Sequence, residues 1–584
     1  MRRLQTAFAA IGMFFIAATS YAAGPYPADP SPQPVLTWST LKLASAYSGF
    51  ATAVFPPSGT PQYNINYSGD NLDTTALDAA LGGQVGSLTF LINQMPGTYS
   101  LQSGIPGSPS ISTAQTGAGR AIVFRGGSQS GALFSLNTPD LSALAIPCDT
   151  WTMMAVVQPT SSTFVNQAGA PGVSVGTLFN FTTTGGNSLS IVNDAQSGAR
   201  GAWALTDGGA FNFSPTDTNV PINPQVLTVS SGATYGTRIC VNENCRAVST
   251  RPTCSGNINY AYLGKMASSA AGANSRSGDF RFAGAMIWKV ELTDAQTVKP
   301  RAALYERFAI NPGISSRAAY QLLFIGNSIT AGHNDLPGIC GYACSLIPAL
   351  TEKNVRVLNY AIPGSTISVN PQASYAYTSA VGQFATSVAP NLADDSAGSV
   401  VVIQGGGNDS GIGPAARTGT THGNTTIDGF TTVADIAVGN YVFASNLPNL
   451  TRVTAVNTGT NTITVDNAAT SSITGNMWFS SASPTDVFNS IKDVSYRSVG
   501  RGAKKVIVVS VLPRSSSDRP YGAAINALLA GATGMPFQYV DCASYGALGT
   551  IPGADYADSA HPTPAGFADM RDCLLSALNA ALTP

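Results

Sequence analysis

Four short polar segments in the C-terminal half of the sequence hold the residue types that nucleophilic catalysis needs, and each follows a predicted strand. They are Gly326-Asn327-Ser328, Ile362-Pro363-Gly364-Ser365, Gly406-Gly407-Asn408-Asp409 and Asp558-Ser559-Ala560-His561. Acyl transfer requires a nucleophile, a base that takes its proton, a carboxylate that orients the base, and hydrogen-bond donors for the developing oxyanion. Together the segments offer a residue for each of these roles.

The roles divide among five residues. Ser328 would attack the ester carbonyl carbon, His561 would accept the serine proton, and Asp558 would hold the imidazole through its Nδ1 atom. The backbone N–H groups of Ser328 and Gly364 and the side-chain amide of Asn408 would donate to the oxyanion. Glycine at position 364 lets the backbone come close to the substrate. This chemistry needs no metal and no cofactor.

Each of these residues taken alone has a simpler explanation. A serine after a glycine commonly forms only a turn, and so do an Asn-Asp pair and a His-Pro pair. The sequence holds 3 histidines, however, and His561 occupies the position that the mechanism requires. We expect His422 to be structural or exposed. For His333, a solvated loop position and a contact with substrate both remain open.

Continuous apolar runs separated by helical stretches predict the elements that position these segments. The runs are Gln321 to Ile325, Val355 to Tyr360, Val400 to Ile403, Val506 to Leu512 and Phe537 to Val540. Runs that are apolar on both faces and alternate with helices indicate a parallel sheet in a doubly wound α/β domain. Ligands bind at the carboxyl ends of such strands, so we expect the four segments to converge there.

The ordered set Gly-x-Ser, Gly, Gly-x-Asn-Asp and Asp-x-x-His-Pro resembles the SGNH hydrolases, the GDSL-type esterases, over residues 320 to 580. The resemblance implies a flavodoxin-like α/β/α sandwich. It also implies site roles, with Ser328 as nucleophile, Gly364 and Asn408 as oxyanion donors, and Asp558 and His561 completing the triad. We therefore place the hydrolase domain at residues 316–584.

The sequence departs from this family at one position next to the nucleophile. Asn327 stands where many members have Asp, which puts in question any supporting contact made by that carboxylate. The pattern Gly326-x-Ser328-x-Thr330 also lacks the second glycine of a G-x-S-x-G elbow. This argues against an ordinary α/β-hydrolase.

One block interrupts the alternation of strands and helices. Residues 411–483 are rich in Thr, Val, Asn and Gly, which predicts β-hairpins inserted into the hydrolase domain. The block leaves directly from the loop that bears Asn408. We therefore expect the insertion to shape the acyl or sugar site.

The N-terminal half shows short strands without intervening helices, which predicts an all-β jelly-roll sandwich over residues 41–315. Trp151 to Val157 reads as a strand, and Phe280 to Leu292 alternates as a half-buried strand should. A capping box at Thr293 opens a short helix towards Phe308. Because no motif is shared across the boundary near 315, we expect each half to fold alone.

This half is similar to concanavalin-A-type jelly rolls. Leu43 to Gly49 and Leu72 to Leu77 resemble, at a distance, the catalytic jelly roll of arabinofuranosidase B, whereas Ile92 to Gly97 departs from it. No catalytic carboxylate pair can be placed, so no residue role is carried over. The resemblance implies carbohydrate binding. Its tryptophans would either stack on sugar rings or fill the core.

Length, charge and the N-terminal residues limit the classes of protein that the sequence can belong to. The length of 584 residues predicts several domains, and 29 basic against 30 acidic residues give no electrostatic footprint for nucleic acid. An apolar run from Ala7 to Ala18 after two arginines predicts a signal peptide at residues 1–23, and residues 24–40 form a Pro-rich leader. That run is too short to span a membrane, and no longer one follows.

The cysteines agree with export. The 8 cysteines divide evenly between the halves, which suits disulfides formed in an oxidising compartment. Cys340 and Cys344 could pair, and so could Cys542 and Cys573, but the sequence does not fix the connectivity. A metal site at Cys340 and Cys344 would need a second ligand pair, and none is near.

The sequence therefore predicts an esterase secreted to the extracellular or periplasmic space. It would remove acyl groups, acetyl in the first instance, from a carbohydrate or a small ester. Two alternatives stay open: a carbohydrate-binding or adhesion protein with an inactive hydrolase domain, and a glycosidase that acts through the N-terminal jelly roll. The sequence gives neither the sugar nor the oligomeric state.

Overall fold

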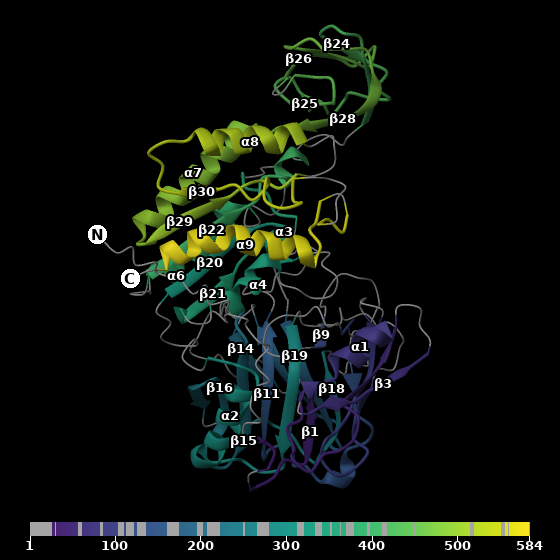
Figure 1. The fold of residues 1–584 in the computed structure, drawn as a ribbon, viewed down its shortest axis with the longest axis vertical. Coiled ribbons are helices and arrows are strands. Elements are labelled where there is room, and N and C mark those ends of the chain that lie inside the picture. Colours follow the sequence, from purple (N-terminus) through teal and green to yellow (C-terminus); the bar gives the residue numbers. More distant parts are fainter. Residues whose placement is uncertain are drawn as a thin grey trace, which may run out of the picture.

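The computed structural model describes most of the chain. The described residues are 26–29, 31–56, 61–69, 71–81, 86–102, 110–111, 122–124, 136–159, 175–194, 202–206, 222–248, 251–264, 280–311, 320–332, 341–350, 353–362, 364–368, 379–393, 398–411, 417–448, 451–513, 519–549, 555–558 and 560–582. The predicted signal peptide, His333 and Cys340 lie outside them. Figure 1 shows a β-rich N-terminal half, an α/β domain above it, and a small β-domain at the far end.

Antiparallel strands make up the N-terminal half. They are β1 Leu36–Ser39, β2 Thr52–Phe55, β3 Tyr63–Ile65, β4 Tyr67–Ser68, β5 Asn71–Leu72, β6 Gly86–Leu91, β7 Leu101–Gln102, β8 Ser110–Ile111, β9 Ile122–Phe124, β10 Leu136–Asn137, β11 Trp151–Pro159, β12 Val175–Thr183, β13 Ser188–Asp194, β14 Ala202–Thr206, β15 Gln225–Gly232, β16 Gly236–Val241, β17 Asn244–Val248, β18 Ile258–Leu263 and β19 Phe280–Trp288. Helices α1 (Thr74–Leu81), η1 (Ser142–Leu144) and α2 (Asp294–Arg307) accompany them. The arrangement agrees with the predicted all-β half.

Two layers of strands enclose an aromatic core. Phe179 of β12 packs against Trp38 of β1 and Phe282 of β19, with ring centroids 6.3 and 5.8 Å apart. Phe181, also on β12, packs against Trp151 of β11 at 5.5 Å. Because β12 belongs to one layer and the other three strands to the facing layer, these contacts hold the layers together as a sandwich.

The tryptophans of this half belong to its interior. Trp151, Trp203 and Trp288 are at most 1% exposed. A ring that stacks on a sugar needs an exposed face, so of the two roles left open by the sequence these three residues take the structural one.

The strand at residues 280–288 differs from the prediction of a half-buried strand that reaches Leu292. Every residue of β19 is buried, and the strand ends at Trp288. A bulge opposite Val156 and Val157 leaves Ala283 without a partner in the ladder. Phe282 and Ala285 therefore both face the sandwich core. Helix α2 covers the other face, which explains why neither side of the strand meets solvent.

The N-terminal domain begins earlier than predicted, and its closing helix starts where predicted. The predicted leader of residues 24–40 contains β1, whose Trp38 is fully buried and which pairs with β19, so the domain begins before residue 41. The capping box is confirmed: Thr293 and Gln296 exchange side-chain and backbone hydrogen bonds at the start of α2, and Phe308 caps its end.

Five parallel strands form the centre of the α/β domain. They are β20 Tyr320–Gly326, β21 Val355–Asn359, β22 Gly398–Gln404, β29 Lys505–Val509 and β30 Gln538–Val540. Their spatial order is β21-β20-β22-β29-β30, and each neighbouring pair is parallel. Counted along the chain this is the order 2-1-3-4-5 of flavodoxin-like sheets, as the sequence resemblance implies.

Helices cover both faces of this sheet (Figure 1). The helical segments are α3 Ser328–Ala331, α4 Gly341–Ala349, α5 Ala380–Gln383, η5 Phe384–Val388, α6 Ala389–Ala393, η6 Asn408–Gly411, α7 Pro484–Gly500, α8 Arg519–Gly531 and α9 Pro564–Ala581. Side chains of α4 and α9 pack on one face, and those of α5, α7 and α8 pack on the other. The domain is therefore a three-layer α/β/α sandwich.

The predicted insertion forms a separate small sheet. Its strands are β23 Arg417–Thr421, β24 Thr426–Asp428, β25 Tyr441–Phe443, β26 Val453–Asn457, β27 Thr462–Val465 and β28 Thr474–Ser480. It has a hydrophobic core of its own, but Tyr441 and Phe443 pack into the core of the α/β domain. The Phe443 ring meets Tyr521 edge-on, with centroids 5.1 Å apart. The insertion is thus anchored to α8 as well as to the loop it leaves.

Three disulfides lie wholly within the described residues. Cys148 pairs with Cys254, Cys240 with Cys245, and Cys542 with Cys573, the last being a pairing that the sequence left open. Cys344 is also disulfide-bonded. The bonds are compatible with a secreted protein. Within the described residues, no helix has both the length and the apolar character that crossing a membrane would require.

A short segment of the N-terminal half, just before β15, packs against the α/β domain. Ile222 donates its N–H to Val357 O of β21 at 2.9 Å, and Asn223 brackets the same strand through Val357 N (2.8 Å) and Val355 O (3.1 Å). The Ile222 side chain is fully buried within the core of the α/β domain. This contact argues against the expectation that each half folds alone.

Replacing Ile222 by alanine should therefore destabilise the α/β domain from outside its own sequence. Truncation of a buried Ile commonly costs about 2 to 5 kcal/mol, which lowers the melting temperature of a domain of this size by at least about 4 °C. The melting temperature followed by circular dichroism measures the effect. Val298→Ala, at an exposed position of α2, is the control. Equal melting temperatures for both variants would contradict a shared core.

Candidate active site

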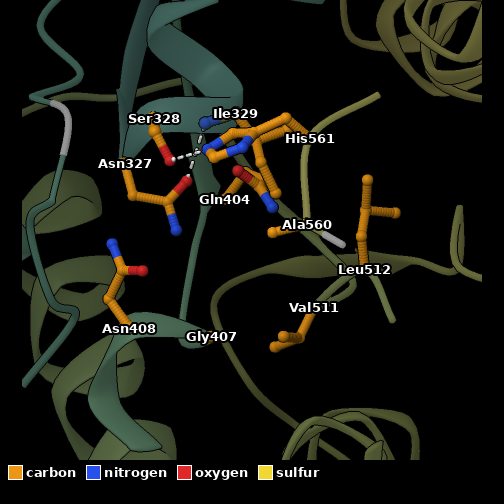
Figure 2. A pocket seen from close by; sticks show the side chains of 10 residues that line it. All are labelled: Asn327, Ser328, Ile329, Gln404, Gly407, Asn408, Val511, Leu512, Ala560 and His561. Carbon is orange, nitrogen blue, oxygen red and sulfur yellow. Dashed lines mark hydrogen bonds between the residues drawn. The ribbon is translucent and has the colours of Figure 1, made fainter. Parts of the chain in front are cut away.

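The structure brings together the three residues predicted as a triad (Figure 2). Ser328 Oγ lies 2.9 Å from His561 Nε2, and His561 Nδ1 lies 2.9 Å from Asp558 Oδ2. The serine is 7% exposed. A hydroxyl, an imidazole and a carboxylate joined in this order can transfer the serine proton to the ring and stabilise the resulting imidazolium.

The turn that carries Asp558 and His561 is held by the aspartate itself. Asp558 Oδ1 accepts the backbone N–H groups of Ala560 and His561 at 2.7 and 2.8 Å. Partial burial raises the pKa of Asp558, but the hydrogen bonds from the ring and backbone of His561 and from Ala560 outweigh it and hold the pKa at about 2. The carboxylate is thus charged wherever the enzyme would work.

The nucleophile stands where β20 gives way to α3. Gly326 ends the strand, and a Cβ there would lie 2.6 Å from Gln404 O of the neighbouring strand, so only glycine fits. Asn327 caps α3, because its Oδ1 accepts the N–H of Ile329 at 3.1 Å. The amide oxygen makes this capping contact, so the departure from Asp at position 327 leaves the start of the helix capped.

The predicted oxyanion donors lie on two loops that are joined to each other. Gly364 is exposed and has φ +79°, which favours glycine. Asn408 lines the same cavity as Ser328 and donates from Nδ2 to Ser365 O at 2.8 Å. That bond uses one of the two amide hydrogens, so the other is left for a substrate oxygen.

Asp409 is a buried residue whose part in the site the sequence did not reveal. Its carboxylate accepts the N–H groups of Ile367 and Ser368 at 2.8 Å each, and also the Ser368 hydroxyl. Complete burial raises the pKa of Asp409 to about 6, against hydrogen bonds that lower it. The carboxylate thus ties the loop after Gly364 to the loop of Asn408. In the sequence, only the position of Asp409 next to Asn408 indicates that it belongs to the site.

A second layer of buried polar groups supports the same loops. Gln383 brackets Gly326, accepting its N–H at 3.0 Å and donating to its oxygen at 2.9 Å, and also donates to Ser365 Oγ. Thr330 Oγ1 donates to Gln404 Oε1 at 2.9 Å. No motif marks these contacts, because glutamines and threonines are common in every part of a sequence.

The cavity at the nucleophile is small. Ten residues line it, namely Asn327, Ser328, Ile329, Gln404, Gly407, Asn408, Val511, Leu512, Ala560 and His561, around about 10 Å³. Strands β21 and β22 lie on opposite sides of β20, so the order of the strands reverses at β20. The cavity lies at this point of the sheet. Ser328 follows β20 and Asn408 follows β22, so the residues meet at the topological switch point where open α/β sheets bind ligands.

The other histidine of the described residues takes no part in this site. His422 Nε2 lies 2.9 Å from Asp428 Oδ1 in the insertion, and both side chains are substantially exposed, as expected. Within the residues that the structure describes, no group of three or more metal-ligating side chains comes together.

Ester hydrolysis should fall as the pH is lowered from about 8 to about 4, because an imidazole base must be neutral to take the serine proton. Asp558, with a pKa of about 2, stays charged throughout and is not the cause. Initial rates on p-nitrophenyl acetate measure the profile.

The control for this profile is Asp409→Asn. The pKa of Asp409 is raised to about 6 by burial, so its protonation falls in the same range. If the fall reflects loss of the neutral base, the variant keeps it. A profile that becomes flat in the variant would assign the fall to Asp409, and a flat profile in the unaltered protein would argue against a histidine base.

No family model and no curated protein matches the sequence. Solved structures similar to this chain include a GH54 α-L-arabinofuranosidase, at 14% identity and a TM-score of 0.35 over 47% of this chain and 63% of that one. TesA is similar at 16% identity and 0.26 over 45% and 99%. A carbohydrate acetylesterase family member from Sinorhizobium meliloti is similar at 11% and 0.26 over 45% and 99%.

The chain spans less than two thirds of the arabinofuranosidase structures, and all these likenesses are distant. The similar structures include members of both families that the sequence resembles, the SGNH hydrolases and the arabinofuranosidases.

Proposed function

We propose that the protein is a secreted serine esterase that removes acyl groups, acetyl in the first instance, from a carbohydrate. The observation that carries the proposal is the chain of hydrogen bonds from Ser328 Oγ through His561 to Asp558, at 2.9 Å for each step. It lies at the switch point of the sheet, beside the amide of Asn408. The disulfides and the N-terminal apolar run support export.

In the first half of the reaction, Ser328 Oγ attacks the carbonyl carbon while His561 Nε2 takes its proton. The oxyanion accepts hydrogen bonds from the N–H groups of Ser328 and Gly364 and from the Asn408 amide. The carbon–oxygen bond to the alcohol then breaks, and His561 returns its proton to the leaving oxygen. Asp558 remains ionised and stabilises the imidazolium throughout.

In the second half, water attacks the acyl-serine. His561 takes a proton from the water, and the second tetrahedral intermediate collapses with the proton returned to Ser328 Oγ. The acid leaves, and the site is restored.

Purified protein should hydrolyse p-nitrophenyl acetate and release acetate from acetylated polysaccharides. Comparing xylan, pectin and other acetylated polymers identifies the carbohydrate. Hydrolysis of the small ester without release from any polymer would retain the esterase and reject the carbohydrate substrate. Binding to a polymer with no hydrolysis of either substrate would favour the carbohydrate-binding alternative.

Three of the described carboxylates of the N-terminal half make structural contacts. Glu243 and Asp294 pair with Arg301 and Arg238. Glu291 accepts the N–H groups at positions 234 and 235 at 2.8 and 2.9 Å. A glycosidase acting there would need two other carboxylates that face each other across a substrate.

A further inference from the structure

A second cavity opens beside the one that holds Ser328. Its volume is about 220 Å³, far more than the 10 Å³ at the nucleophile. The two cavities share Gly407, Val511 and Leu512, so they adjoin each other. Figure 2 shows Val511 and Leu512 on the opposite side of the catalytic cavity from Asn408. The second cavity is therefore a neighbour of the nucleophile.

The lining of this second cavity is mainly apolar. The further residues around it are Ser410, Pro513, Tyr521, Gly522, Ala523, Asn526, Ala543 and Gly549. Val511, Leu512 and Tyr521 are at least 96% buried, so the surface that a ligand can reach comes mainly from Pro513, Gly522, Ala523, Ala543 and Gly549, which are half-buried or exposed. Such a surface favours the binding of an apolar ligand group, which gains free energy when it is removed from water.

The few polar groups that line this cavity are already used by the protein. Tyr521 OH donates to Ala482 O at 3.0 Å, and Ser410 Oγ donates to Gly407 O at 2.8 Å. Asn526 accepts the N–H of Val511 at 2.8 Å and donates to its oxygen at 2.9 Å. A sugar in this space would therefore gain few hydrogen bonds from these side chains.

Contacts outside the cavity hold its lining residues in place. Asn526 fixes the loop after β29 to α8 through both polar atoms of Val511. Phe443 of the insertion packs edge-on against Tyr521. The insertion thus supports one wall of the cavity. Through this contact the insertion can influence the shape of the acyl site.

We propose that the second cavity receives the acyl chain of the ester, so that acetyl is the smallest acyl group accepted and not the preferred one. This inference rests on the proposed function, in which the alcohol is a polar sugar. An apolar cavity of about 150 Å³ holds benzene, so 220 Å³ accommodates an acyl tail of about six carbons. The sugar then lies outside this cavity, where its hydroxyls keep their hydrogen bonds.

The chain-length dependence of hydrolysis tests the assignment. The kcat/KM for p-nitrophenyl esters should rise from acetate to hexanoate by roughly tenfold or more, since each buried methylene contributes up to about fourfold. It should fall again at dodecanoate, whose chain exceeds the cavity. A parallel series of acetates with longer alcohols should show no comparable rise.

Two alanines on α8 provide a matched pair of variants. Ala523 and Ala527 are both exposed and one helical turn apart, but only Ala523 lines the cavity. Ala523→Trp should lower kcat/KM for hexanoate by about tenfold and leave acetate within about twofold, because the indole fills the space that the chain would occupy. Ala527→Trp should leave the whole series unchanged.

The outcomes separate this inference from the proposed function. Hydrolysis of acetate with no rise towards hexanoate would overturn the acyl assignment alone. So would a rise that Ala523→Trp leaves intact, or a rise confined to the alcohol series. A protein that hydrolyses no ester, acetate included, would overturn the proposed function and this inference with it.

Discussion

Replacing Ser328 by alanine should abolish ester hydrolysis, with a fall in kcat on the order of 10⁶-fold, as loss of a catalytic serine causes in other triad enzymes. The Oγ atom is the only atom removed, and the hydrogen bond to His561 Nε2 is lost with it. His561 keeps its partner Asp558, and Asn327 still caps α3, so the fold should not change.

Initial rates on p-nitrophenyl acetate and labelling by a fluorophosphonate measure the loss together. The unaltered protein should take up one label, and Ser328→Ala none. Ser345→Ala is the control, because this hydroxyl of α4 donates to Tyr342 O and lies outside the site. Undiminished hydrolysis by Ser328→Ala in a protein with an unchanged circular dichroism spectrum would exclude Ser328 as nucleophile.

Asn408→Ala should lower kcat by about 10²- to 10³-fold, the usual cost of removing one oxyanion donor. The amide already holds Ser365 O at 2.8 Å, so the loop of Gly364 loses a contact as well. Asp409 still binds that loop through Ile367 and Ser368, which should keep it in place. KM should change little, because the lost bond is made in the transition state.

Separate kcat and KM values on p-nitrophenyl acetate test this role. Asn467→Ala serves as the control, since that side chain contacts only its neighbour Asp466 among the hydrogen bonds that we describe. A kcat within about threefold of the unaltered protein would remove Asn408 from the oxyanion site. A rise in KM with unchanged kcat would instead give it a role in binding substrate.

The parallel strands could be predicted from the sequence because they are buried on both faces. The run at Val400 to Ile403, for example, is apolar at every position and falls within β22. The meeting of Ser328, His561 and Asp558 could be predicted for a related reason. Each of its loops follows a strand of one sheet, so the topology alone brings them to one edge.

Other features depend on contacts between distant segments. The alternation from Phe280 onwards suggested one buried face, but the bulge at Ala283 depends on the register with β11 and changes the face. The burial of Ile222 depends on β21, which is more than a hundred residues away. The second cavity combines a loop, a helix and Ala543, which share no motif. Local sequence patterns carry no information of this kind.

The bracket formed by Ile222 and Asn223 has a consequence for self-association. β21 is the outermost strand of its sheet, and an uncovered strand of this kind presents a row of unpaired peptide groups that can recruit other chains. Ile222 and Asn223 occupy three of those groups, Val355 O, Val357 N and Val357 O. The N-terminal half thereby covers this edge of the α/β domain against edge-to-edge aggregation, whatever it binds.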